Sequence, residues 1–186
     1  MSVMVCSLST KQSKIYWCPI CGKSFEISNN VTEEIHHHFV RHLVKFFLHR
    51  GFIIIEEGKI PKEEIAEGWR SPDIFVLDKN LRLIKIIEVI VSNPFMGTTS
   101  RGDSILDKCR KIHNAYCSGI NQPPEIIIFI PIKLINLVYD VEYEARKLGK
   151  VRADESLQEL YERRLKSEGI DVKVWTPEDL KELEEK

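Results

Sequence analysis

The sequence predicts an α/β fold, a mixed sheet flanked by helices, with a small appendage at the amino terminus. Short apolar runs rich in isoleucine are bounded by turn residues, as buried strands are. Between these runs lie longer stretches in which apolar residues recur at helical spacing. The chain of 186 residues is long enough for one such domain with a substantial core.

The predicted elements follow one another with recognisable start and stop signals. Thr32 begins a helix, because Glu33 and Glu34 place acids in its first turn, and Gly51 ends it. Near the carboxyl terminus, Thr176 caps a short helix that has proline at its first position. Strands are expected at 52–55, 73–77, 83–91, 125–130 and 172–175, and further helices at 103–116, 133–148 and 156–167.

Composition and charge narrow the classes of protein to consider. The formal net charge is −1, so bulk charge does not indicate a nucleic-acid partner, and any basic surface must be local. No secretory signal opens the chain, and no apolar run approaches the ~20 residues that span a bilayer. We therefore expect a cytoplasmic protein with no membrane partner. Five cysteines, two of them as Cys-x-x-Cys, then indicate a metal site and not disulfides.

The metal site is expected in the segment from Tyr16 to Phe25 and in the helix that follows it. Cys18 and Cys21 can turn two thiolates toward one ion, with a glycine directly after them. His38 and His42 are spaced i,i+4 on one helix face, which suits two imidazoles on a single tetrahedral Zn²⁺.

This segment resembles a two-Cys, two-His zinc finger, which implies a structural zinc with no open coordination position. Sixteen residues separate Cys21 from His38, where about twelve are usual. His36 and His37 compete with His38 for the third ligand position. We expect a finger-like region at 1–45 whose helix continues into a main domain at 32–186. The finger either contacts DNA or is a clasp that stiffens the amino terminus, and the sequence leaves both open.

Two carboxylates lie in the most apolar part of the chain. Asp73 opens one predicted strand, and Glu88 lies in the middle of the next, with fourteen residues between them. A charge inside so apolar a strand is costly to bury unless it has a partner. Two carboxylates on adjacent strands can hold one Mg²⁺, so the pair predicts a magnesium site.

The segment Pro72-Asp73 and the glutamate at 88 resemble the motif of the PD-(D/E)xK nucleases, the restriction-endonuclease-like superfamily that includes archaeal Holliday-junction resolvases. The resemblance covers roughly Thr32 to Ile130 and includes the order of helix, strand, strand hairpin and helix. It implies a DNA endonuclease that uses Mg²⁺ or Mn²⁺ and that acts as a homodimer. Ile90 stands where the family has a lysine, which helps to orient or activate the attacking water.

Strand parity and helix spacing suggest where a replacement lysine would lie. Lys85 points to the opposite face from Glu88, because side chains alternate along a strand. Lys108 and Lys111 share one face of the next helix and are the candidates, although both also fit a solvated helix surface. Arg101 could grip a phosphate. Among Glu34, Glu56 and Glu57, no spacing selects a further carboxylate.

Two other interpretations remain open at this stage. A protein with the nuclease fold but without catalytic activity would bind nucleic acid or protein through the surface of the former active site and through the finger. The isoleucine at position 90 favours this interpretation. A zinc-stabilised interaction domain with no nucleic-acid role would fit the near-neutral charge. Retention of both Asp73 and Glu88 favours the endonuclease.

Overall fold

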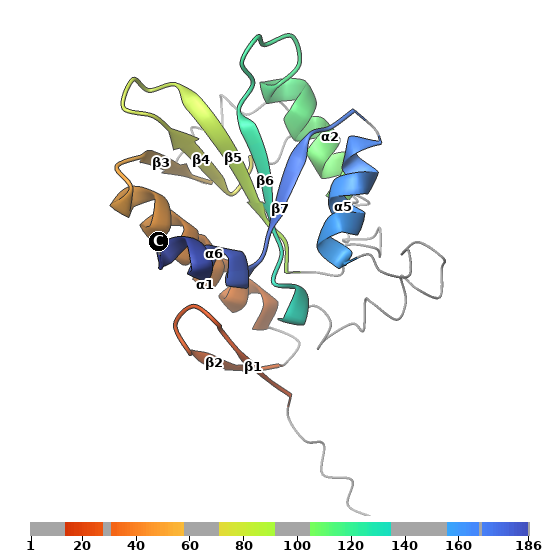
Figure 1. The fold of residues 1–186 in the computed structure, drawn as a ribbon. Helices are drawn as coiled ribbons and strands as arrows, with labels where there is room; N and C mark the ends of the chain where they lie inside the picture. The colour runs from red at the N-terminus through yellow and green to blue at the C-terminus, as the bar shows by residue number, and fades with distance from the viewer. Residues whose placement is uncertain are drawn as a thin grey trace, which may run out of the picture.

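The computed structural model describes residues 14–27, 31–57, 71–91, 105–134, 156–167 and 169–185. In these ranges the chain forms a five-stranded sheet of order β3-β4-β5-β6-β7 and a two-stranded sheet of β1 and β2 (Figure 1). The strands are β1 (Ile15–Trp17), β2 (Ser24–Glu26), β3 (Ile53–Glu56), β4 (Ile74–Leu77), β5 (Leu83–Val89), β6 (Glu125–Phe129) and β7 (Val172–Trp175). The helices are α1 (Val31–His49), α2 (Ile105–Tyr116), α5 (Leu157–Lys166) and α6 (Pro177–Glu184).

The large sheet is mixed, as the sequence predicts. Its first three strands run antiparallel to one another, and β6 and β7 continue from β5 in parallel. The parallel part needs a crossover between successive strands, and α2 supplies the one between β5 and β6. β4 and β5 are therefore a hairpin at the centre of the sheet, which is where the predicted carboxylates lie.

Helices cover both faces of the large sheet: α1 and α6 lie on one face, and α2 and α5 lie on the other (Figure 1). Side chains of β5 alternate between these layers. Ile87 and Val89 are buried with α1, whereas Ile86 and Ile90 are buried with α2. Both faces of β5 are apolar because helices cover both of them. Glu88 is a charged residue on the face that α2 covers.

Most expected elements are present, with ends that differ by one or two residues, as element ends commonly do. The β1–β2 hairpin is an addition that the predicted strands did not include. The helix expected at 133–148 can be followed only to Leu134, because the rest lies outside the described residues. Arg101 lies outside them as well. None of the described helices is long and apolar enough to cross a membrane.

Candidate metal centres

The β1–β2 hairpin places the two cysteines of the Cys-x-x-Cys segment. The Cys18 amide donates to the Lys23 carbonyl at 2.9 Å, and the Gly22 amide donates to the Cys18 carbonyl at 2.8 Å. Gly22 has a φ of 71°, a left-handed conformation that glycine adopts without strain. This tight turn brings Cys21 back beside Cys18, so that both thiols lie at the same end of the hairpin.

Helix α1 brings two histidines to these thiols. His38 Nε2 lies 3.5 Å from Cys21 Sγ and 3.2 Å from His42 Nε2. Ligand atoms from Cys18, Cys21, His38 and His42 all lie within 4.8 Å of one another. Tetrahedral zinc bonds would separate two nitrogens by about 3.3 Å and a nitrogen from a sulfur by about 3.6 Å. The four side chains thus fit a single ion, and they could hold a structural metal such as zinc.

The two competing histidines have other neighbours. His36 Nε2 lies 3.2 Å from Asp73 Oδ1, and His37 Nε2 lies 3.9 Å from Glu33 Oε1 on the surface of the same helix. The group that could hold a metal therefore contains His38 and not His36 or His37.

Electrostatics at this cluster favour the neutral imidazoles that metals bind. Burial, followed by the nearby His42, lowers the pKa of His38 to about 4, and burial also lowers the pKa of His42. Burial raises the pKa of the Cys18 thiol, which opposes the thiolate form in the absence of a metal. A bound cation would reverse that effect, because metal binding releases the thiol proton.

The hairpin does not stand apart from the main domain. Tyr16 and Phe25 are buried in the same apolar cluster as Phe39 of α1 and Phe129 of β6. The rings of Tyr16 and Phe39 are 6.3 Å apart, and those of Phe25 and His38 are 4.9 Å apart, both edge to face. The metal cluster thus joins the hairpin to a helix that is itself part of the core.

Strand register places the predicted carboxylates opposite one another. β4 and β5 pair Ile74 with Ile87, and the next position in the same register sets Asp73 across from Glu88. Side chains of directly opposed residues point to the same face, with their Cβ atoms about 4.5–5.5 Å apart. Asp73 and Glu88 are both buried, at 5% and 4% exposure. The structure therefore brings the two residues together at one end of the central hairpin.

Each carboxylate has partners from a different part of the fold. The Val89 amide donates to Asp73 Oδ2 at 2.6 Å, while His36 of α1 approaches Oδ1. Lys108 of α2 forms an ion pair with Glu88 Oε1. Glu88 Oε2 is buried and has no hydrogen-bond partner among the residues that the structure describes. That oxygen, next to a second carboxylate, suits a cation.

Neighbouring charges shift the pKa values of Glu88 and Lys108. Burial, followed by the nearby Asp73 carboxylate, raises the pKa of Glu88 to about 8 against the opposing effect of Lys108. Burial alone would lower the pKa of Lys108, but Glu88 and Asp73 outweigh it and raise that pKa. When Asp73 and Glu88 are both ionised, Lys108 offsets only part of their negative charge, and a divalent cation would stabilise this ionised form.

Of the two candidate lysines, Lys108 is the one that reaches the carboxylates. Lys111 lies on an exposed part of α2. Lys85 forms an ion pair with Glu125 on β6, in agreement with its predicted orientation away from Glu88. Ile90 is buried in the same apolar cluster as Cys109 of α2.

Two neighbours of the site were not selected by sequence reasoning. His36 was considered only as a zinc ligand. Glu57 follows β3, and its amide donates to the Asp73 carbonyl at 2.9 Å, so three acidic residues lie in a row across β3, β4 and β5. The negative charge of Glu57 also raises the pKa of Glu88. Strand register, which was not known, is the information that would have selected it.

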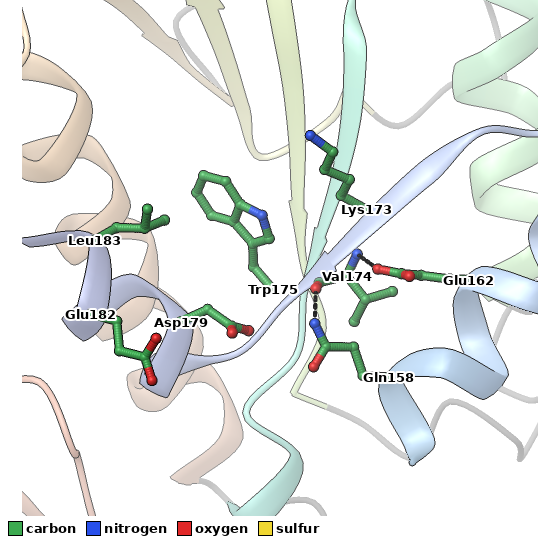
Figure 2. Close-up of a pocket in the computed structure, with 8 residues that line it drawn as sticks. All are labelled: Gln158, Glu162, Lys173, Val174, Trp175, Asp179, Glu182 and Leu183. Carbon is green, nitrogen blue, oxygen red and sulfur yellow. Dashed lines mark hydrogen bonds between the residues drawn. The ribbon is translucent and has the colours of Figure 1, made fainter. Parts of the chain in front are cut away.

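A cavity of about 280 Å³ lies away from the carboxylates, beside the edge strand β7 (Figure 2). Its walls come from α5, β7 and α6, and its residues are Gln158, Glu162, Lys173, Val174, Trp175, Asp179, Glu182 and Leu183. Glu162 accepts from the Val174 amide at 2.8 Å, and Gln158 donates to the Val174 carbonyl at 2.5 Å. Side chains of α5 thus occupy backbone groups that an added strand would otherwise use.

The double variant Gln158→Ala/Glu162→Ala is expected to aggregate faster than the wild type, because it frees those two backbone groups at the edge of the sheet. Each lost bond should also lower the free energy of unfolding by about 0.5–1.5 kcal/mol. Light scattering at several protein concentrations measures the first effect, and denaturant unfolding the second. Glu182→Ala, in the opposite wall of the cavity, is the control, and equal aggregation of both variants would contradict the edge-protecting role.

Comparison of the chain with models of known protein families, with curated proteins and with solved structures finds no match.

Proposed function

We propose that this protein is a metal-dependent DNA endonuclease of the PD-(D/E)xK kind, in which Asp73 and Glu88 hold Mg²⁺ or Mn²⁺. The observation that carries the proposal is the pair of buried carboxylates opposed across β4 and β5, with Glu88 Oε2 lacking a hydrogen-bond partner among the described residues. Burying two carboxylates side by side is costly, and a divalent cation is the partner that best offsets that cost.

The order of elements supports the same proposal. α1, the strand β3, the β4–β5 hairpin and α2 follow one another in the order of helix, strand, hairpin and helix on which the resemblance rests. Asp73 precedes the first strand of the central hairpin and Glu88 lies near the end of the second, as in the family motif.

Lys108 supports the proposal at the point where the motif departs from the family. The family lysine stands two positions after the glutamate, and here that position is Ile90. Lys108 approaches the same glutamate from α2 and forms an ion pair with it. We therefore assign to Lys108 the part of the missing lysine, which is to place an ammonium group beside the metal-binding carboxylates.

Each residue of the site would have its own role in cleavage. A divalent ion bound there would supply an activated water and would neutralise charge on the phosphodiester. Asp73 and Glu88 provide oxygen ligands, and the Val89 amide holds Asp73 in place. Lys108 provides a positive charge at the site. The Cys18, Cys21, His38 and His42 cluster with bound zinc would serve as a clasp, since its helix is packed into the core.

Cleavage of linear, single-stranded and four-way-junction DNA in the presence of Mg²⁺ or Mn²⁺ tests the proposed function. We expect cleavage that chelator abolishes and that Asp73→Asn removes. Asp171→Asn, which removes an exposed carboxylate before β7, is the matched control. Cleavage that survives in Asp73→Asn would assign the activity to another site. Light scattering of the same samples would test the homodimer that the resemblance implies.

A nuclease-fold binding protein without catalysis is the second candidate. The observation that favours it is that Lys108 and His36 already give Glu88 and Asp73 partners without a metal. Under this alternative, folded and zinc-loaded protein cleaves none of the three substrates and still binds at least one of them in a mobility-shift assay.

A further inference from the structure

His36 approaches Asp73 from one side of the sheet, and Lys108 approaches Glu88 from the other side. His36 belongs to α1, whereas the lysine partner of Glu88 belongs to α2. The His36 side chain is 25% exposed, and its Nε2 lies 3.2 Å from Asp73 Oδ1. Because Asp73 precedes β4 at the end of the sheet, its carboxylate can be reached from both layers of helices.

The direction of His36 is determined by the packing of α1. Ile35, Phe39 and Leu43 form a fully buried stripe on this helix, so its rotation about its own axis is fixed by the core. At 3.6 residues per turn, His36 lies on one side of that stripe, and His38 and His42 lie on the other. The same helix therefore presents one histidine to Asp73 and a different pair to the cysteines.

Two contacts together restrain the Asp73 carboxylate. The Val89 amide donates to Oδ2, and His36 Nε2 lies 3.2 Å from Oδ1, so rotation of the carboxylate would disturb both contacts. Each carboxylate oxygen has two lone pairs, so both contacts leave acceptor capacity for a cation. An aspartate held in this way does not have to reorganise when an ion binds.

We propose that His36 is a positioning residue of the carboxylate site, which orients Asp73 for binding a divalent cation through the contact between Nε2 and Oδ1. The inference rests on the proposed function and goes further, because it adds a residue from α1 to the site. Groups that orient metal ligands typically contribute about 10–100-fold to metal affinity. The role requires a hydrogen-bond donor at the place of Nε2, and it does not require an imidazole.

Binding of Mn²⁺ to zinc-loaded protein, measured by calorimetry and by electron paramagnetic resonance, tests this role. His36→Ala is expected to weaken the Asp73-dependent Mn²⁺ site by about 10–100-fold. His36→Gln should bind much as the wild type does, because its amide nitrogen can take the place of Nε2. His37→Ala is the matched control, since His37 is the exposed neighbour whose nearest acid is on the helix surface.

The outcomes separate this inference from the proposed function. Wild-type binding in His36→Ala, or an equal loss in His36→Gln and His36→Ala, would overturn the role of His36 and leave the carboxylate site standing. Absence of any Mn²⁺ site that depends on Asp73 in the wild type would overturn the proposed function and this inference with it. Thermal unfolding of each variant identifies a loss that comes only from misfolding.

Discussion

Replacing Lys108 by methionine is expected to lower the rate of metal-dependent DNA cleavage by about 10²–10³-fold, the usual effect of removing one oriented electrostatic group from an active site. Methionine keeps most of the length and apolar volume of the lysine stem but has no charge. The ion pair with Glu88 is then lost, and the proton affinity of this buried carboxylate rises further. The measurement is the single-turnover rate at saturating Mg²⁺.

The control for this experiment is Lys111→Met, the same substitution one turn further along α2. Lys111 is exposed, and we expect cleavage close to that of the wild type. The double variant Lys108→Met/Glu88→Gln should recover part of the stability lost in Lys108→Met, because no carboxylate is left buried without its partner, but it should not recover activity. Equal rates for the Lys108 and Lys111 variants would exclude Lys108 as the replacement for the motif lysine.

Removal of the metal from the cysteine and histidine cluster is expected to have the largest effect on stability. Any ligand present at about 100 times its dissociation constant stabilises the native state by about 2.7 kcal/mol. In a domain of this size that corresponds to a fall of about 5–11 °C in Tm when zinc is withdrawn. The hairpin should separate from α1 first, because the cluster joins the two. Differential scanning calorimetry of zinc-loaded and chelated protein measures the change.

Cys21→Ser is the variant of choice for this experiment. Cys21 is exposed, so its replacement removes a ligand without leaving a cavity, whereas Cys18 is buried. The variant should unfold at the temperature of chelated wild type and should not respond to zinc. Ser24→Ala, an exposed change in the same hairpin, should keep the full response to zinc. A wild type whose Tm is unchanged by chelator would contradict a structural metal at this cluster.

Local patterns in the sequence were enough to predict those parts of the two sites that lie within a single helix, strand or turn. The i,i+4 spacing of His38 and His42 and the Cys-x-x-Cys turn predicted a cluster that the structure assembles within 4.8 Å. Strand alternation correctly separated Lys85 from Glu88, because parity holds along a strand without any knowledge of its neighbours.

Contacts between elements were harder to predict. His36 was read as a possible zinc ligand because it lies among histidines, yet its partner is Asp73, which is on a strand far along the chain. Glu57 could not be chosen from three glutamates, since its place beside Asp73 follows from the pairing of β3 with β4. Lys108 and Lys111 looked alike by helix spacing, and only the approach of α2 to the sheet distinguishes them.

The contact between α1 and β7 has a consequence for how the chain folds as it is synthesised. Trp175 stacks on Phe47 at 6.1 Å, and Arg50 lies over the ring of Phe46 and donates to the Leu183 carbonyl. An early helix thus depends on the last strand and helix for its cover. While a ribosome is still adding residues 172–184, the aromatic rings of α1 lack that cover and are open to other nascent chains. Chaperones would therefore be needed until residues 172–184 have been synthesised.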